Sequence, residues 1–396
     1  MRSGKLLAIA ALLTLSLSTY CAAQASEHVI HTFTTLAQGF PASSLVPDSH
    51  GNLYGVNSGS VYELSPTGNG GYTYHFLCYL PEGRGVFASG KLAIDAAGNL
   101  YGSVWQGGLT GAGYTYEVSP PSSGNRWTVN IIYNFTGTEG AQADGGLIMD
   151  AAGNLYGGTW NGGTYDEGVA FELSPGPSGW TYNLLHEFSN AEGNGPQTAL
   201  IFDKNGNLFG GNETSIYELS PNGDGTWTFS TAFAFTDATG ANPLGDPIFD
   251  AAGNLYGTTQ AGGPYGGGTA FMVSNSGGTC NGTVIHAFNY RNTNDGYDPY
   301  GGLTLDAQGN LYGTTIGGGG TNNTGIVFEL SPNSDGTWTE TLLHRFGPAG
   351  STAGNGPENS LYLDPSGNLI GTADGGGDDA CYAVGGGCGL IFKIVR

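Results

Sequence analysis

Basic residues are scarce in this sequence. Only 10 lysines and arginines accompany 32 aspartates and glutamates among 396 residues, so the formal net charge at pH 7 is −22. A surface with this charge repels the phosphate backbone of nucleic acids and anionic lipid headgroups. The charge balance therefore excludes nucleic acid as a partner.

Long apolar runs are missing after the first residues. Met1–Lys5 carries two positive charges, and an apolar run over 6–18 precedes several small residues. This order is typical of a signal peptide, and the run is too short to span a membrane. We predict a signal peptide over 1–25, cleaved near Ala23 or Ala25, and no membrane span. The mature protein is then secreted, periplasmic or held at the cell surface.

Cysteine is also rare, with five residues in the chain. Cys21 lies within the predicted signal peptide, where lipidation is an alternative to simple cleavage. Cys381 and Cys388 flank a short glycine-rich loop, and we predict a disulfide between them because exported proteins are oxidised. The sequence leaves the pairing of Cys78 and Cys280 open.

Helical periodicity and common catalytic motifs are absent as well. No segment after the signal peptide places apolar residues at helical spacing, which excludes an α-helical fold. The chain has no G-x-S-x-G, H-E-x-x-H or phosphate-binding loop. The enzyme classes that depend on those motifs are therefore not indicated.

A repeated motif dominates what the sequence does contain. DAAGNLYG occurs at 95–102, 150–157 and 250–257, and four looser copies occur elsewhere. The seven leading aspartates are Asp48, Asp95, Asp150, Asp203, Asp250, Asp306 and Asp364. Spacings near 50 residues are typical of solenoids and propellers.

Each repeat contains four short segments rich in β-branched and aromatic residues, bounded by Gly, Pro, Asn or Ser. The D-x-x-G-N step joins the first two as a turn, since Asp bonds nearby amides and Gly supplies positive φ. We therefore predict an all-β fold, a seven-bladed β-propeller of four-stranded antiparallel blades, over 26–396. The last repeat lacks a fourth strand, and 28–34 (HVIHTFT) matches that strand, so we expect the N-terminal strand to close the ring.

Two further sets of residues recur at one register of the predicted fourth strand. Four tryptophans open this strand, and four histidines stand near its end. Repetition at one register predicts packing, for the histidines on the outer part of a blade. A metal site built from the histidines is not expected, because the ring separates them. The residues are Trp127, Trp180, Trp227 and Trp338, with His31, His186, His286 and His344.

The pattern D-x-x-G-N-L-Y-G-T-T, followed by G-G and G-x-V-F-E-L-S-P, resembles the extracellular tandem repeat named for Gloeobacter and Verrucomicrobia. Segments 250–259 and 306–315 fit it best, and the resemblance covers nearly the whole mature chain. It implies an exported bacterial protein, and it implies no catalytic residues. Family members often carry a C-terminal sorting anchor, which the sequence lacks, so surface attachment is not implied.

The face that carries the second-to-third-strand loops and the blade crossings is the expected site of function, because its loops surround the channel mouth. Aromatic residues stand among glycines and asparagines in these loops, an arrangement suited to stacking on sugar rings. The candidate ligand-binding residues are Trp105, Trp160, Tyr165, Tyr265, Tyr297 and Tyr300. The alternative is that these rings pack down on blade edges.

Acidic residues that do not repeat are candidates for a single site, since such a site must break the symmetry. Asp374, Asp378 and Asp379 lie in a glycine-rich loop that could chelate calcium. Asp144, Asp166, Glu167, Asp295 and Asp298 lie on the same predicted face. No organic cofactor is indicated.

Binding or scaffolding outside the cell is the predicted function, with a polysaccharide or an extracellular protein as partner and a monomeric state. The alternative is a carbohydrate-active enzyme, a glycoside hydrolase or lyase, that uses carboxylates at the channel mouth. A purely structural spacer is a third possibility. Near-equal repeats favour binding, because catalysis needs residues that a single blade supplies.

Overall fold

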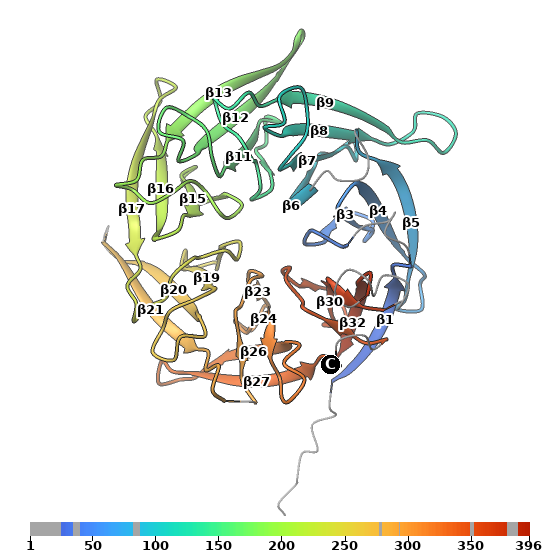
Figure 1. Cartoon of the computed structure of the whole chain (residues 1–396), viewed down its shortest axis with the longest axis vertical. Coiled ribbons are helices and arrows are strands. Elements are labelled where there is room, and N and C mark those ends of the chain that lie inside the picture. The colour runs from blue at the N-terminus through green and yellow to red at the C-terminus, as the bar shows by residue number, and fades with distance from the viewer. Residues whose placement is uncertain are drawn as a thin grey trace, which may run out of the picture.

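Seven four-stranded antiparallel sheets form a closed ring (Figure 1). The computed structural model describes residues 25–34, 40–81, 88–276, 279–292, 294–348, 352–377 and 387–396. Across these ranges the regular elements are strands, and no helix there could cross a membrane. The predicted all-β, seven-bladed propeller is confirmed.

The blades are numbered by their order along the ring, and the strands of each run from the channel outwards. Blade 1 contains β2 (Val46–Pro47), β3 (Leu53–Asn57), β4 (Ser60–Pro66) and β5 (Tyr72–Tyr79). Blade 2 contains β6 (Ala88–Ile94), β7 (Leu100–Val104), β8 (Tyr114–Ser119) and β9 (Thr128–Asn134). Blade 3 contains β10 (Ile148–Met149), β11 (Leu155–Thr159), β12 (Val169–Gly176) and β13 (Gly179–Glu187). Blade 4 contains β14 (Ile201–Phe202), β15 (Leu208–Gly211), β16 (Ser215–Pro221) and β17 (Trp227–Ala234).

The remaining blades follow the same order. Blade 5 contains β18 (Ile248–Phe249), β19 (Leu255–Thr259), β20 (Thr269–Ser276) and β21 (Thr279–Ala287). Blade 6 contains β23 (Thr304–Leu305), β24 (Leu311–Thr315), β26 (Ile326–Pro332) and β27 (Trp338–Arg345). Blade 7 contains β29 (Tyr362–Leu363), β30 (Leu369–Ala373), β32 (Leu390–Val395) and β1 (Ser26–Thr32). Two small ribbons join β22 (Gly296–Tyr297) to β25 (Gly317–Gly318), and β28 (Gly354–Asn355) to β31 (Gly375–Gly376).

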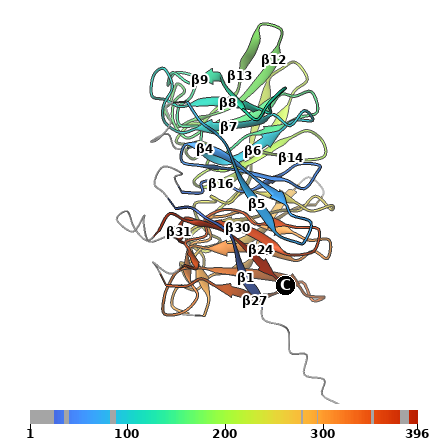
Figure 2. The same ribbon diagram turned by 90° about the vertical axis from the view of Figure 1, so that its right-hand side faces the viewer.

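The N-terminal strand closes the ring as predicted. In Figure 1 the blue β1 lies beside the red β32, and Figure 2 shows the same pairing from the side. The antiparallel register runs from Ser26 opposite Val395 to Thr32 opposite Leu390. The outermost strand of blade 7 therefore comes from the opposite end of the chain, which joins the two ends of the ring non-covalently.

The repeated aspartate organises the turn between the first two strands of each blade. In blade 6, Asp306 accepts hydrogen bonds from the backbone nitrogens of Gln308 (2.9 Å) and Asn310 (2.8 Å). The Asn310 side-chain amide and the Tyr312 hydroxyl donate to its other carboxylate oxygen, both at 2.9 Å. Gly309, at φ +90°, ends the turn in a conformation that suits glycine. The motif is thus a structural turn.

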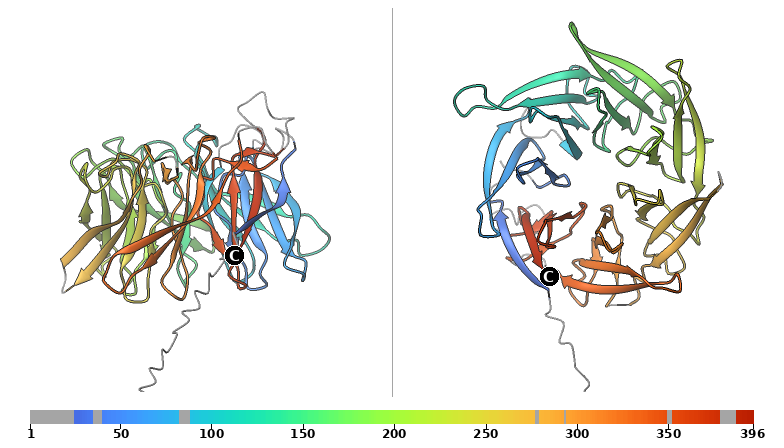
Figure 3. Two further views of the ribbon diagram at one scale, coloured as in Figure 1. Left: turned by 90° about the horizontal axis from the view of Figure 1, so that it is seen from below. Right: turned by 180° about the vertical axis from the view of Figure 1, so that it is seen from behind.

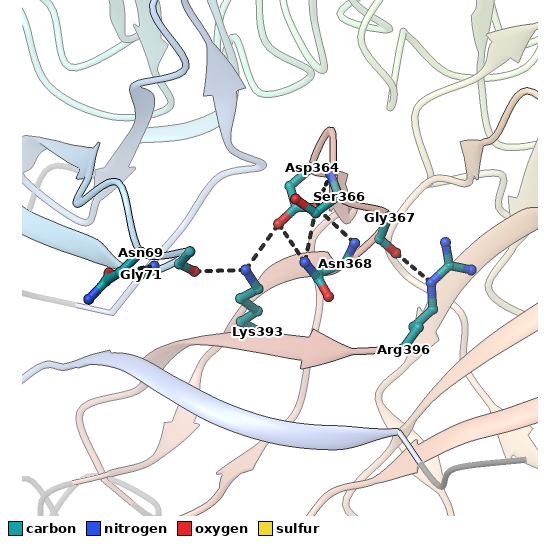
Figure 4. Close-up of polar contacts among 9 residues, drawn as sticks. Asn69, Gly71, Asp364, Ser366, Gly367, Asn368, Lys393 and Arg396 are labelled. Atoms are coloured by element: carbon teal, nitrogen blue, oxygen red, sulfur yellow. Dashed lines mark hydrogen bonds and ion pairs between the residues drawn. The ribbon is translucent and has the colours of Figure 1, made fainter.

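Blade 7 keeps this turn with a different donor (Figure 4). Ile370 replaces the tyrosine, and its cross-strand neighbour Lys393 replaces the glutamate of most other blades. The Lys393 ammonium lies 3.0 Å from the Asp364 carboxylate and donates to the Gly70 carbonyl of blade 1 at 2.8 Å. The exchange of two residues therefore preserves the turn and links blade 7 to blade 1.

A glycine in the second strand makes room for an aromatic ring of the third. A Cβ atom on Gly257 would lie 2.7 Å from the ring of Phe271, which is 1% exposed. The same close approach occurs in every blade, between Gly55 and Tyr62, Gly102 and Tyr116, Gly157 and Phe171, Gly210 and Tyr217, Gly313 and Phe328, and Gly371 and Phe392. The G of the NLYG motif is explained by this contact.

The blades pack on one another through the predicted outer-strand positions. Each of the four tryptophans lies against the tyrosine of the preceding blade, as Trp180 does against Tyr101 with ring centroids 5.7 Å apart. The histidines contact the next blade: His31 stacks on Tyr74 at 3.8 Å, and His186 stacks on Phe229 at 4.7 Å. The predicted packing role is confirmed for these contacts, although several histidines also face a carboxylate.

The two faces of the ring carry different loops (left panel of Figure 3). Because the strands alternate in direction, the D-x-x-G-N turns and the outer hairpins lie on one face. The second-to-third-strand loops and the blade crossings lie on the other, which we call the crossing face. The crossing face carries the residues that line the central pocket.

Candidate functional site

A pocket of about 270 Å³ opens at the centre of the crossing face. The crossing segments of all seven blades contribute to it, together with Trp160 and Asp374 from second-to-third-strand loops. The lining residues are Pro41, Ala42, Ser44, Gly90, Lys91, Asp144, Gly145, Trp160, Gln197, Leu244, Asp246, Tyr300, Gly301, Gly302, Glu358, Asn359, Ser360 and Asp374.

Two registers of the crossing segments supply most of this lining, counted back from the turn aspartate of each blade. Six residues before that aspartate, the seven blades carry seven different residues: Ala42, Ser89, Asp144, Gln197, Leu244, Tyr300 and Glu358. Four residues before it stand Ser44, Lys91, Gly146, Ala199, Asp246, Gly302 and Ser360. Six residues of the first register line the pocket, and all six differ, so the repeat symmetry is lost there.

The lining is acidic. Asp144, Asp246, Glu358 and Asp374 contribute four carboxyl groups, and Lys91 contributes the one cationic side chain among the lining residues. Burial raises the pKa of Asp374 well above its usual range, and the Glu358 carboxyl, hydrogen-bonded to it, raises it further. Burial also raises the pKa of Glu358. The hydrogen bond between the two groups raises the pKa of Asp374 and lowers that of Glu358, so Asp374 is the donor of the pair.

Asp246 is held between two blades. Its Oδ1 accepts a hydrogen bond from the Ala199 backbone nitrogen at 2.9 Å. Burial raises the pKa of Asp246, while that hydrogen bond and the charge of Lys91 oppose the rise and Asp144 adds to it. The carboxyl groups of blades 3 and 5 and the Lys91 ammonium therefore act on one another across the pocket.

Hydrogen bonds between neighbouring blades stiffen the floor of the pocket. The Gly302 nitrogen donates to Ser360 Oγ at 2.9 Å, and the Ser360 nitrogen donates to Ser44 Oγ at 3.1 Å. Between blades 2 and 3, the Leu147 nitrogen donates to the Lys91 carbonyl at 3.0 Å. A site built on such cross-links is held in place without a ligand.

Two of the six predicted aromatic residues line the pocket. Trp160 follows β11, and Tyr300 precedes β23, and these side chains are 38% and 39% exposed. Burial raises the pKa of Tyr300, with further contributions from Glu358, Asp144 and Asp374. Its hydroxyl therefore remains a hydrogen-bond donor beside the carboxyl groups.

The other four predicted aromatic residues lie outside the pocket lining. Tyr165 and Tyr265 are 60% and 53% exposed on the loops of blades 3 and 5. Tyr297 packs over Gly317 in the small ribbon, and its hydroxyl accepts a hydrogen bond from Asn323. Trp105 is half-buried, although it occupies the same register as Trp160. The prediction of binding by these four residues is untested.

The predicted metal and disulfide residues fall partly outside the described chain. Asp374 lies in the pocket beside Glu358, whereas Asp378 and Asp379 are outside the described residues, so calcium binding there stays a prediction. Cys388 is buried and disulfide-bonded. Its predicted partner Cys381 is outside the described residues, so that pairing also stays a prediction.

The two cysteines whose pairing the sequence left open are free thiols, Cys78 and Cys280. Burial raises the pKa of the Cys78 thiol to about 12, which keeps it protonated and unreactive. Neither cysteine contributes to the pocket.

Sequence reasoning singled out Asp144 and Asp374 but missed Lys91, Asp246 and Glu358. The signal that could have found them is the register count from the turn aspartate, because the pocket positions are the ones where the repeats stop agreeing. Inspection of the loops alone does not reveal this, since Asp246 lies between Gly245 and Pro247 directly before a strand.

Solved structures of the same fold have very different sequences. Virginiamycin B lyase from Staphylococcus aureus superposes with a TM-score of 0.57 at 11% identity, covering 94% of this chain and 99% of the lyase. A protein from Lactobacillus plantarum gives 0.50 at 14% identity, covering 90% and 98%. A chain of the mitotic checkpoint complex gives 0.56 at 12% identity, covering 100% and 98%. These likenesses support the propeller fold alone.

No curated protein matches the sequence. The family model of the Gloeobacter/Verrucomicrobia repeat does match it, over residues 16–215 and 211–385. These two segments cover nearly the whole ring, and the predicted resemblance is confirmed. The chain belongs to the Gloeobacter/Verrucomicrobia repeat family.

Proposed function

We propose that this protein is an extracellular carbohydrate-binding module whose central pocket holds one sugar unit. The observation that carries the proposal is the composition of the pocket. Six equivalent positions that line it carry six different residues on an otherwise repeated frame. A spacer would have no need for such variation, whereas a ligand with distinct faces requires different partners around it.

The chemistry of the lining favours a polyhydroxylated ligand. Trp160 and Tyr300 offer exposed rings at the pocket, against which the apolar face of a sugar could stack. The carboxyl groups and Gln197 offer acceptors for sugar hydroxyls. Because four acids face a single lysine, we expect neutral or amino sugars to bind and uronic acids to be rejected.

The pocket volume supports a small ligand unit. Its 270 Å³ corresponds to about nine water molecules at liquid density and lies just below the range of about 300–1,000 Å³ for drug-sized pockets. We therefore expect a monosaccharide or the end of a longer chain, and not the middle of a polysaccharide lying across the face.

An extracellular location is consistent with the sequence and the family. The predicted signal peptide over 1–25 and the family resemblance both point to export. The acidic surface suits a neutral polysaccharide or a basic protein partner better than an anionic one. A protein partner on the crossing face is the remaining scaffold alternative.

Binding is tested with the mature chain on a glycan array, followed by calorimetry with the sugars retained. Trp160→Ala is expected to weaken binding about tenfold or more, the effect of losing about 1.4 kcal/mol. Trp105→Ala is the matched control, because Trp105 has the same register in the neighbouring blade but lies outside the pocket lining. Equal affinity in Trp160→Ala and the parent chain would reject the pocket as the binding site.

A second candidate function, glycoside hydrolysis, is favoured by the Glu358–Asp374 pair. Such a reaction needs one carboxyl group that is protonated near neutral pH and a second that is ionised. The raised pKa of Asp374 favours the acid role, and Asp144 is a further carboxyl group of the pocket lining. The protonated acid would protonate the glycosidic oxygen, which leaves as an alcohol. The ionised carboxylate would take a proton from the water that adds to the anomeric carbon.

The release of reducing ends from the retained glycans separates these two functions. Under the hydrolase alternative, Asp374→Asn abolishes release and leaves retention, and Asp335→Asn on the opposite face leaves both unchanged. Retention without any release by the parent chain supports the binding module. Absence of both retention and release would leave a protein partner as the better explanation.

A further inference from the structure

A second cluster of polar side chains lies between the outer edges of blades 5 and 6. His286 comes from β21, Asp295 precedes β22, and Glu340 comes from β27. His286 Nε2 is 3.6 Å from Asp295 Oδ1 and 3.7 Å from Glu340 Oε2, and one ligand atom from each residue lies within 4.8 Å of the others. The side chains are only 19%, 8% and 21% exposed.

These separations suit the coordination sphere of a small divalent ion. Imidazole and carboxylate ligands bind Zn²⁺ at about 2.0–2.2 Å, so two ligands of a tetrahedral site are separated by about 3.3 Å. A shift of a few tenths of an ångström would bring His286 Nε2 to that distance from each carboxylate oxygen, and the two carboxylates would adjust around the ion. Three protein ligands leave the fourth position to water.

The surrounding contacts hold the ligands in place. Asp295 accepts hydrogen bonds from the backbone nitrogens of Asn289 (3.0 Å) and Gly296 (2.8 Å), which orient its carboxylate toward the histidine. The His286 ring meets Phe288 edge-on at 4.6 Å. In contrast, His286 Nε2 and Glu340 Oε1 are buried without a hydrogen-bond partner. A metal ion coordinated by these two side chains would supply the partner that these buried atoms lack.

The other blades provide the comparison that makes this cluster distinctive. The residue at the His286 register always faces the residue at the Glu340 register of the next blade, as in His31 on Tyr74 and His186 on Phe229. A histidine also meets a glutamate between blades 6 and 7, where His344 Nε2 lies 3.3 Å from Glu27. Among the described residues, the interface of blades 5 and 6 alone brings a histidine, a crossing acid and a glutamate together.

We propose that His286, Asp295 and Glu340 bind one divalent transition-metal ion, such as Zn²⁺, and that the ion holds blade 5 against blade 6. The nitrogen ligand favours Zn²⁺ over the oxygen-seeking Ca²⁺ and Mg²⁺. None of the three ligands lines the crossing-face pocket, so the metal site and the pocket share no residue. Its role is therefore structural and independent of carbohydrate binding.

Calorimetry on the mature chain, stripped with EDTA and dialysed, tests this proposal with ZnCl₂ as the probe. We expect one equivalent of Zn²⁺ to bind and to raise the melting temperature. Glu340→Gln and His286→Phe are each expected to weaken binding at least about tenfold. Phe is chosen because Phe233 occupies the equivalent position in blade 4. Co²⁺ substitution gives a second readout, a visible absorption band that Glu340→Gln abolishes.

The matched control is His344→Phe, which removes the histidine of the two-residue pair between blades 6 and 7. This variant is expected to retain the Zn²⁺ stoichiometry and affinity of the parent chain. The proposal is overturned if the parent chain takes up no Zn²⁺, or if Glu340→Gln and His286→Phe bind as tightly as the parent. The cluster would then be a hydrogen-bonded packing contact between blades.

Discussion

At the residue scale, one position can serve packing, charge or coordination according to its neighbour in the next blade. His31 and His186 stack on aromatic rings, and His186 also faces Glu192. His344 faces Glu27, and His286 faces two acids. Tyr133 and Phe233 fill the same register elsewhere. The backbone places the side chain, and the partner determines what that side chain does.

His31 is expected to make the ring sensitive to acid. Burial lowers the pKa of His31 to about 4, below its unfolded value of about 6.5. Its neutral form stabilises the fold fully above pH 6.5, and this contribution is lost as the pH falls from 6.5 toward 4. The free energy of unfolding of the parent chain should therefore fall between pH 7 and pH 4.5. In His31→Phe this fall should be smaller by about 1–2 kcal/mol.

Urea unfolding at the two pH values measures this difference. His75→Phe is the control, because His75 is exposed on β5 and has no such buried contact. Titrations of the carboxylates affect parent and variant alike and cancel in the comparison. A His31→Phe variant with the same pH dependence as the parent would show that His31 protonation does not limit stability.

At the scale of the single blade, the contact between the second and third strands explains more of the motif than any catalytic role would. The glycine of NLYG admits the aromatic ring that fills the centre of the blade. The aspartate anchors the turn, and burial alone would raise the pKa of Asp306, but hydrogen bonds from Asn310, Tyr312 and Gln308 lower it. Each letter of the repeat therefore has a local structural reason.

Gly257→Ala tests the glycine contact. The added methyl group would lie 2.7 Å from the buried Phe271 ring, so the ring or the strand must shift. We expect a loss of about 1–3 kcal/mol, the usual cost of overpacking a core. Gly71→Ala is the control, since its methyl group would meet only the Thr67 hydroxyl at 3.0 Å and the Asn69 side-chain oxygen at 3.4 Å, in an outer hairpin. Similar urea midpoints for the two variants would contradict this account.

At the scale of the whole molecule, we expect stability to depend on closing the ring, and the proposed binding site depends on residues that break its symmetry. β1 completes blade 7 by pairing with β32. Two further contacts join blade 7 to blade 1, because Lys393 donates to the Gly70 carbonyl and the Ser360 nitrogen donates to Ser44 Oγ. The pocket lies where these blades converge and draws on all of them. A site assembled in this way exists only in the closed ring.

Removing β1 is therefore expected to destabilise the whole propeller. A chain that begins at Thr34 loses the β1–β32 ladder and the fully buried Phe33 side chain. We expect a loss of at least about 3 kcal/mol, from the buried apolar area and the exposed edge of β32. A chain that begins at Ser26 is the control and should melt like the full-length protein. Equal melting temperatures for the two truncations would show that blade 7 is stable with three strands.

The sequence by itself determined the number of blades, the strands of each blade and the closure of the ring. These features rest on local patterns, since Asp306, Gly309 and Gly257 act on residues within one turn or one pair of strands. Only the tertiary structure decided which side chains meet between blades. Asp374 meets Glu358, Asp246 faces Lys91, and His286 approaches Glu340, because the ring brings together residues that lie many positions apart. Local sequence patterns do not show which distant residues meet. The pocket and the cluster of His286, Asp295 and Glu340 are therefore visible only in the folded ring.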